Sequence, residues 1–428
     1  MPWLNRLCWA ALPLAGLAGT VVSKRFEIAS PKYAVWAVFF LGVVVLRGSA
    51  VWNVRALRYL LPLLPFCLGV ILAQIMVPYS QIIALTHGVG FPALVGSMAL
   101  LASEIRSVSQ LATALRSFLA GLAATAVVLV VPYFLFGSLE PGGMYFNPTD
   151  FGLPYALLYD SNLNLPFFLG LLFAVGFACA RGDLGHGNIR WLSWRSAIWI
   201  GLLAALVVLL VAANRRNVML ALALTLMAVL LRRWAWPMWL VPLLMPLVWG
   251  PVSAALVVGV EAIGADRILR RTASEDVITA NNRDLVWNHT LDRLVHPFMG
   301  REYFHGDREE LGNAMTEIRF GDESFWVVYH AHNTALEAFM SFGLVGWIGY
   351  LLSYGWLGKQ THVLMRRRWW SGEGGWVARV LVIGVVFCVM CGGAESLARL
   401  DSLEWVAWLG LWMLGSSAIL VSAKSDHE

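Results

Sequence analysis

Charge is scarce in this sequence. Only 13% of its 428 residues are Asp, Glu, Lys or Arg, against roughly 25% in an ordinary soluble domain. Hydrophobic residues make up 59% of the chain, and the mean hydropathy is +0.68. So little charge cannot cover a water-facing surface of ordinary size. The composition therefore excludes a soluble globular protein and predicts a membrane protein with many spans.

The sequence also lacks the alternation of apolar and polar residues that a membrane β-barrel needs. Its apolar segments are continuous, and about 20 such residues in a helix cross the roughly 30 Å hydrocarbon core. We therefore expect an all-α integral membrane protein with about twelve transmembrane helices, the first of them uncleaved. The predicted spans are 7–22, 33–46, 59–77, 80–102, 117–137, 164–180, 196–214, 217–231, 236–260, 333–357, 375–393 and 403–422.

Cysteines are few, and all five fall inside the predicted spans. Cys388 and Cys391 have the CxxC spacing, but a single pair in an apolar helix matches neither a zinc site nor a redox motif. We expect both to pack in the core. The outer loops have no DxD pattern and no clear carboxylate cluster for magnesium, and the HxH at His330 and His332 matches no standard zinc spacing. The sequence thus predicts no metal site and no cofactor.

Lys and Arg are unevenly distributed between the two sets of loops. If both termini lie in the cytoplasm, the inner loops hold sixteen of these residues and the short outer loops hold six. The positive-inside rule favours this orientation. The net charge of +5 then comes from inner loops that lie near anionic lipid, and it requires no nucleic-acid partner.

The predicted spans divide the chain into three regions. Residues 1–260 contain transmembrane helices 1–9, residues 261–331 form a long outer loop region, and residues 332–428 contain helices 10–12. In the loop region, residues 281–298 carry apolar side chains at helical spacing up to Pro297. This pattern predicts an amphipathic helix lying against the outer end of the bundle.

Two adjacent arginines break the charge rule. Arg215 and Arg216 form the predicted outer turn between two spans, where basic residues are disfavoured. They could extend to lipid phosphates, or they could form an anion site, because a guanidinium group binds phosphate oxygens in pairs and stays charged. Arg283 begins the predicted amphipathic helix and is the third candidate. If that helix packs on the turn, these charges converge where a pyrophosphate group could be held.

The tenth span begins with a histidine and an asparagine. His332 could be a structural cap, but a near-neutral pKa also suits it to accept a proton from an attacking hydroxyl. Asn333 could cap the helix or orient the imidazole ring. Glu337 lies about a turn and a half deeper, where an unpaired carboxylate is costly. It could pair with an arginine, orient a substrate, or only donate or accept hydrogen bonds within the bundle.

This stretch resembles a known motif. His332 and Asn333, followed by nine residues, Gly343, two residues and Gly346, fit the pattern H-[NSQ]-x9-G-x2-[GTY] of the O-antigen ligases. Those are membrane glycosyltransferases that attach O-antigen to the lipid A core. The twelve expected helices, the long outer loop between the ninth and tenth, and an arginine that opens a helix add to the resemblance. So does a looser series in the outer loop: Arg283, Trp287, Pro297 and Gly300.

The resemblance implies a helical bundle of the lipid-dependent GT-C glycosyltransferase type, an undecaprenyl diphosphate-linked donor, a lipid A–core acceptor and no metal. It also implies a bacterial inner membrane location, with the active site facing the periplasm. The family histidine falls on His332 and the loop arginine on Arg283. The helix-start arginine falls on Arg216, with Arg215 as the other possibility. Asn333 and Glu337 are supporting residues in this hypothesis.

We expect a single displacement that inverts the anomeric configuration, with His332 as base and the arginines holding diphosphate. Related enzymes share the motif region, namely O-antigen polymerases and protein O-oligosaccharyltransferases. The latter often carry a larger outer portion near the C-terminus, and this chain ends soon after the last span, which favours the ligase. A transporter of polyprenyl-linked glycans is the non-enzyme alternative, because the fourth span carries polar and helix-breaking residues from Thr86 to Pro92.

Overall fold

The structure is a computed structural model of the whole chain. It describes residues 3–26, 31–47, 54–76, 81–136, 138–140, 143–145, 164–184, 194–212, 216–230, 239–240, 242–247, 258, 283–292, 315–320, 323–328, 331, 333–366, 372–394 and 403–425.

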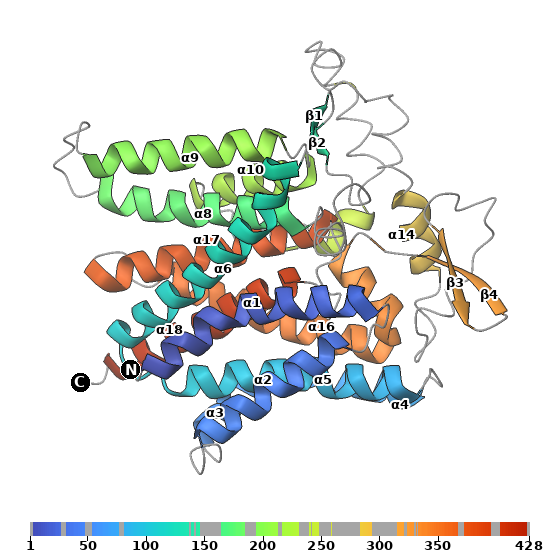
Figure 1. Cartoon of the computed structure of the whole chain (residues 1–428). Coiled ribbons are helices and arrows are strands. Elements are labelled where there is room, and N and C mark those ends of the chain that lie inside the picture. Colours follow the sequence, from blue (N-terminus) through green and yellow to red (C-terminus); the bar gives the residue numbers. More distant parts are fainter. Residues whose placement is uncertain are drawn as a thin grey trace.

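Long helices run alongside one another to form a bundle (Figure 1). In the first half of the chain they are α1 (Trp3–Phe26), α2 (Pro31–Arg47), α3 (Val54–Leu60), α4 (Leu64–Met76), α5 (Gln81–Ser103), α6 (Val108–Phe136), α8 (Asn164–Leu184), α9 (Trp194–Ala212) and α10 (Arg216–Leu230). In the second half they are α16 (Thr334–Arg366), α17 (Gly372–Ala394) and α18 (Leu403–Ser425). A short helix, α14 (Arg283–Leu291), lies beside one end of the bundle.

Each predicted span except the ninth falls on a helix. The third, 59–77, is divided between α3 and α4 by a turn at residues 61–63. The ninth, 236–260, lies largely outside the described residues, although residues 242–247 are helical. By length and composition, four described helices could cross a membrane: Val108–Val131, Thr334–Met365, Gly374–Gly393 and Glu404–Val421. Several shorter helices are also apolar. The chain is therefore a helical membrane protein, and twelve spans remain a prediction.

Helix α16 makes its most extensive contact with α4, and glycines allow the close approach. A Cβ atom on Gly69 of α4 would lie only 2.7 Å from the Cα atom of Gly346 in α16. One turn further along α16, a Cβ atom on Gly349 would collide with the carbonyl group of Pro65. Small residues let membrane helices approach at backbone distance, where dispersion contacts hold them. Gly346 of the histidine motif therefore serves helix packing.

An aromatic cluster fills the bundle beside this contact. The ring of Phe66 lies edge-on to the rings of Phe342, Tyr350 and Trp405, with centroid distances of 5.6 to 5.8 Å. Such edge-to-face pairs stabilise beyond their buried area. The cysteines Cys388 and Cys391 are also in the core, at 0% and 1% exposure, and neither forms a disulfide.

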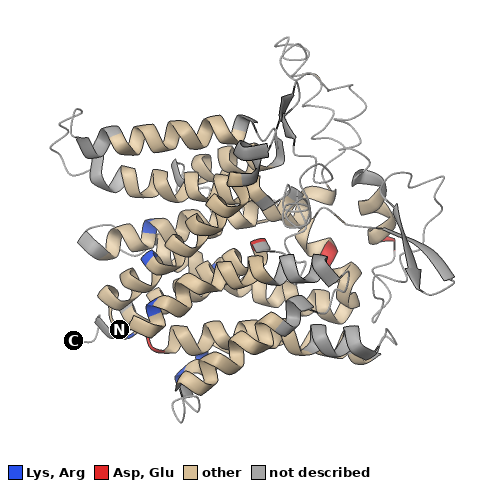
Figure 2. Cartoon of the chain, in the orientation of Figure 1, with Lys and Arg blue, Asp and Glu red and all other residues tan. Residues whose placement is uncertain are grey.

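The bundle has two different ends. Both termini lie at one end (Figure 1), and most of the described Lys and Arg residues lie toward it (Figure 2). At the other end are α14 and a hairpin of β3 (Met315–Phe320) and β4 (Glu323–Val328). A smaller hairpin, β1 (Ser138–Glu140) with β2 (Gly143–Tyr145), lies beyond the end of α6. The orientation of the bundle in the membrane stays a prediction.

The two hairpins correct the all-α expectation in detail. Strands β3 and β4 pair antiparallel from Met315 with Val328 to Phe320 with Glu323. Strands β1 and β2 pair from Ser138 with Tyr145 to Glu140 with Gly143. Both hairpins come from segments predicted to be outer loops, and the bundle itself is helical.

Candidate functional site

The site begins at the first turn of α16, where Asn333 caps the helix. Its side-chain Oδ1 accepts hydrogen bonds from the backbone N–H of Ala335 at 3.0 Å and of Leu336 at 3.1 Å. The first N–H groups of a helix have no partner within the helix, and an asparagine at this position supplies one. Asn333 is 0% exposed, so without this cap these donors would lie unpaired in an apolar bundle.

The other half of the Asn333 amide joins α16 to two further segments. Its Nδ2 donates to the carbonyl oxygen of Pro242 at 2.8 Å and to that of Gly393 at 3.0 Å. Pro242 opens the helical residues 242–247, and Gly393 lies in the last turn of α17. The carbonyls at the end of a helix also lack partners within it. One buried side chain therefore satisfies backbone groups of three segments and fixes their relative position.

Glu337 is a buried carboxylate one turn into α16. It is 0% exposed, and its Oε2 accepts a hydrogen bond from the backbone N–H of Ala331 at 2.9 Å. A carboxylate is costly to bury, and both a backbone donor and the positive end of a helix dipole reduce that cost. Glu337 therefore holds the chain immediately before the helix. Because Glu337 accepts from Ala331 and Asn333 caps the helix, the two neighbours of His332 in the chain are both held in place.

A third contact comes from α14. The indole Nε1 of Trp287 donates to the carbonyl oxygen of Ala331 at 2.6 Å. Around this bond lies a small hydrophobic cluster that is separate from the main core, composed of Val286, Trp287, Ala331, Leu336, Phe339 and Met340. The prediction that an amphipathic helix lies against the outer end of the bundle agrees with this packing.

The predicted charged residues are described to different extents. His332 and Arg215 lie outside the described residues. Arg216 is the first residue of α10 and Arg283 is the first residue of α14. Helix α10 packs against α17 and α8, with Val218 at the α8 contact beside Gly170. The structure thus joins α14, Asn333 and Glu337 around the start of α16. It links α10 to this region through α17, whose last turn Asn333 binds.

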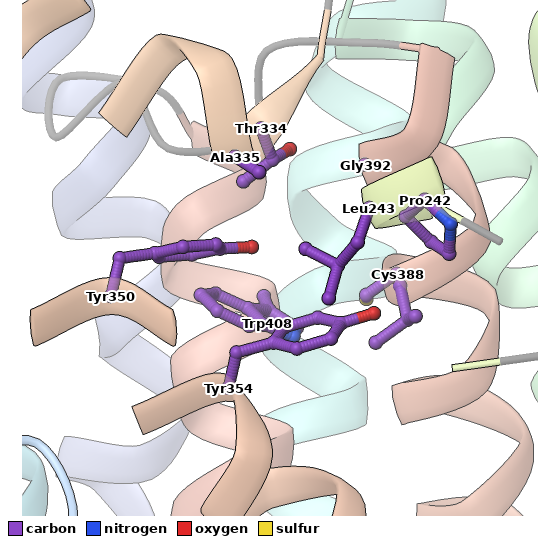
Figure 3. Close-up of a pocket in the computed structure, with 10 residues that line it drawn as sticks. Pro242, Leu243, Thr334, Ala335, Tyr350, Tyr354, Cys388, Gly392 and Trp408 are labelled. Atoms are coloured by element: carbon purple, nitrogen blue, oxygen red, sulfur yellow. The ribbon is translucent and has the colours of Figure 1, made fainter. Parts of the chain in front are cut away.

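A narrow pocket lies inside the bundle beneath the cap (Figure 3). Its free volume is about 10 Å³, enough for roughly one water molecule. Tyr350 and Tyr354 of α16 extend into it from one side, opposite Leu243 and Cys388. The Tyr354 hydroxyl donates to the carbonyl oxygen of Trp239 at 2.8 Å. The pocket is too small for a sugar or an isoprenoid in this conformation, and the hydrogen bond to Trp239 joins that segment to α16.

Several residues of this site were not predicted from the sequence. The roles of Trp287, Pro242 and Gly393 depend on contacts between segments 44 to 91 residues apart. Glu404, a second buried carboxylate, lies in the first turn of α18 with 7% exposure. A usable signal existed for Glu404, because an acidic residue inside a predicted membrane span requires an explanation.

Among the residues that the structure describes, no three His, Cys, Asp or Glu side chains come close enough to hold a metal ion. The expectation of a metal-independent reaction stays a prediction.

The fold and this site define a class: a helical membrane protein whose buried polar groups converge at the start of one long helix. Residues 199–351 match the family model described as O-antigen ligase. This match supports the assignment of the chain to the O-antigen ligase family. It extends from α9 through α10, α14 and the first half of α16, and so includes every predicted site residue. None of the curated proteins matches the chain.

Proposed function

We propose that this protein is an O-antigen ligase that transfers a glycan from undecaprenyl diphosphate to a sugar hydroxyl of lipid A–core in lipopolysaccharide biosynthesis. The observation that carries the proposal is the fixed start of α16 within the family segment. The Oδ1 of Asn333 caps the helix and its Nδ2 donates to the carbonyl oxygens of two other segments, while Glu337 accepts from the N–H of Ala331. Buried polar contacts of this kind make a backbone rigid, and a rigid backbone is what the proposed base, His332, requires to keep a single orientation.

In this mechanism His332 is the general base. Its imidazole takes the proton of the acceptor hydroxyl as the oxygen attacks the anomeric carbon of the donor. The bond between that carbon and the diphosphate oxygen breaks, and the diphosphate leaves with its electron pair. A direct attack from the opposite face inverts the anomeric configuration.

The arginines supply the positive charge for the leaving group. Arg216 and Arg283 each open a helix, and Arg215 is the neighbour of Arg216 in the sequence. The N-terminus of a helix also favours an anion. Guanidinium groups there would bind the diphosphate and stabilise the charge that develops as it departs, so the reaction needs no metal.

The proposed location is the bacterial inner membrane, with a GT-C-type bundle and both termini in the cytoplasm. The end of the bundle with most of the described basic residues would then face inward (Figure 2). The end with α14 and the start of α16 would face the periplasm, where an undecaprenyl diphosphate-linked donor and the lipid A–core acceptor would meet.

Deletion of the gene, followed by gel analysis of lipopolysaccharide, tests this proposal. A ligase predicts loss of all O-antigen-capped lipopolysaccharide and accumulation of the lipid-linked donor. If capping with a single repeat unit survives, the protein is a polymerase. Unchanged lipopolysaccharide with loss of glycans on protein Ser or Thr would indicate a protein O-oligosaccharyltransferase. Donor trapped on the cytoplasmic face would indicate a transporter.

A further inference from the structure

Helix α14 is attached to the start of α16 by a buried face. Val286 and Trp287 are each 1% exposed and Thr290 is 0% exposed, whereas Asn288 and Asp292 are exposed. The buried face packs on Leu336, Phe339 and Met340 of α16. Apolar packing of this kind favours contact between the two helices, but it does not fix their register, because apolar surfaces can slide.

One directional bond fixes that register. The Trp287 indole N–H donates to the carbonyl oxygen of Ala331 at 2.6 Å. That oxygen belongs to the planar peptide group that joins Ala331 to His332. On the other side of the same residue, the N–H of Ala331 donates to Glu337 Oε2 at 2.9 Å. The peptide groups before and after Ala331 are therefore held from two different helices.

The same tryptophan lies on the helix that begins with Arg283. Arg283 precedes Trp287 by four residues, about one turn of α14. The bond from Trp287 to Ala331 therefore ties the helix of the proposed diphosphate-binding arginine to the peptide group that leads into the proposed base.

We propose that Trp287 is a positioning residue that sets the separation between His332 and Arg283 through its hydrogen bond to Ala331. This inference rests on the proposed function of those two residues. Trp287 touches no reacting atom in this scheme. Its indole N–H holds the base at the correct distance from the leaving group, and a displacement of about 1 Å at such a site lowers the rate roughly 10²-fold.

A pair of substitutions separates this role from packing. Trp287→Phe keeps an aromatic ring but removes the N–H donor. Trp9→Phe is the matched control: Trp9 is 0% exposed, its ring packs edge-on against Phe118 at 5.8 Å, and its indole N–H has no hydrogen-bond partner in the described part of the chain. Both changes remove the same atoms from a buried site, but only Trp287→Phe breaks a hydrogen bond.

The full-length variants are compared in proteoliposomes with an undecaprenyl diphosphate-linked donor and a lipid A–core acceptor. We expect Trp287→Phe to lower kcat about 10- to 100-fold with little change in the KM for donor, because binding is retained while the reacting groups are misplaced. Trp9→Phe should keep kcat within about twofold. Equal kcat values for the two variants would overturn the inference.

Two further measurements keep the test decisive. If Trp287→Phe does not fold, 3-benzothienylalanine at position 287 replaces only the N–H by sulfur, and the same fall in kcat is expected. Hydrogen exchange of the peptide that covers residues 329–335 should accelerate about tenfold on loss of the bond, with no change in Trp9→Phe. Unchanged exchange would also overturn the inference. An inactive wild-type protein with the expected exchange pattern would instead contradict the proposed function.

Discussion

At the scale of the residue, Asn333 shows why the second position of the motif needs both a donor and an acceptor. Oδ1 caps α16, while Nδ2 binds the carbonyl oxygens of Pro242 and Gly393. The pattern H-[NSQ] permits Asn, Ser or Gln, and each of these side chains can both donate and accept. Aspartate at this position could cap the helix but would turn an oxygen toward two carbonyl oxygens.

Asn333→Asp is therefore expected to lower the thermal unfolding midpoint in detergent more than Asn333→Ser does. Each buried group left without its partner costs about 1–3 kcal/mol, and the aspartate also places a charge in a site with 0% exposure. The difference in unfolding midpoint between Asn333→Asp and the wild type should shrink at acidic pH, because a protonated carboxyl can donate one hydrogen bond. An aspartate variant as stable as the wild type at neutral pH would show that the Nδ2 contacts carry no stability.

The sequence left two roles open for Asn333, a helix cap or orientation of the imidazole, and the structure shows the cap, which fits an asparagine before an apolar run. The sequence did not predict the partners of the cap, since Pro242 and Gly393 are 91 and 60 residues away. The role of Glu337 was left open among an arginine partner, a substrate contact and a hydrogen bond in the bundle, and the structure shows the last of these with Ala331.

At the scale of the element, α16 contains a break that its hydropathy does not reveal. Gly343 has φ 65° and ψ −171° inside an otherwise helical segment. Only glycine adopts this region readily, and another residue there costs of order 1–3 kcal/mol. The break lies between the motif turn at Asn333 and the packing contact at Gly346. Because of this break, the first turns of α16 can run at an angle to the later turns, which pack against α4.

Gly343→Ala should destabilise the protein by about 1–3 kcal/mol. Gly355→Ala in the same helix is the control, because a Cβ atom there meets nothing within 4 Å, and alanine improves helix propensity by up to about 1 kcal/mol. Denaturation in detergent, followed by intrinsic tryptophan fluorescence, measures both. If the two substitutions shift the midpoint equally, the conformation of Gly343 is not a determinant of stability.

The helices were predictable because about 20 continuous apolar residues define a span. The β3–β4 hairpin was missed because a polar stretch between spans was read only as solvated loop. A signal was present, since Gly321-Asp322 separates two six-residue strands and a Gly-Asp pair is a two-residue hairpin connection. The division of the third span into α3 and α4 was also missed, although Pro62 in the turn at residues 61–63 is a helix-breaking signal.

At the scale of the whole molecule, the two ends of the bundle differ in structure. The termini and most of the described basic residues share one end, and α14 with the β3–β4 hairpin occupies the other (Figures 1 and 2). The count of Lys and Arg in the loops predicts that the end with the termini faces the cytoplasm, and this orientation stays a prediction. The packing of α14 on α16 could not be predicted, because the residues between them in sequence do not fix where a short helix docks.

Single-cysteine labelling tests the orientation. After replacement of the five native cysteines, Asp292→Cys reports the α14 end and Arg106→Cys reports the turn between α5 and α6; both positions are exposed. In cells with a permeabilised outer membrane, an impermeant maleimide should label Asp292→Cys, and it should reach Arg106→Cys only after the inner membrane is disrupted. The reverse pattern would place the site in the cytoplasm.

The central claim is that His332 activates the acceptor hydroxyl in a ligase. Purified wild-type protein and His332→Ala are compared in proteoliposomes that contain an undecaprenyl diphosphate-linked donor and lipid A–core, with a chelator present. We predict glycan transfer by the wild type, and a fall of about 10²- to 10⁴-fold in His332→Ala, the range expected for loss of a general base. Normal turnover by His332→Ala would contradict the account.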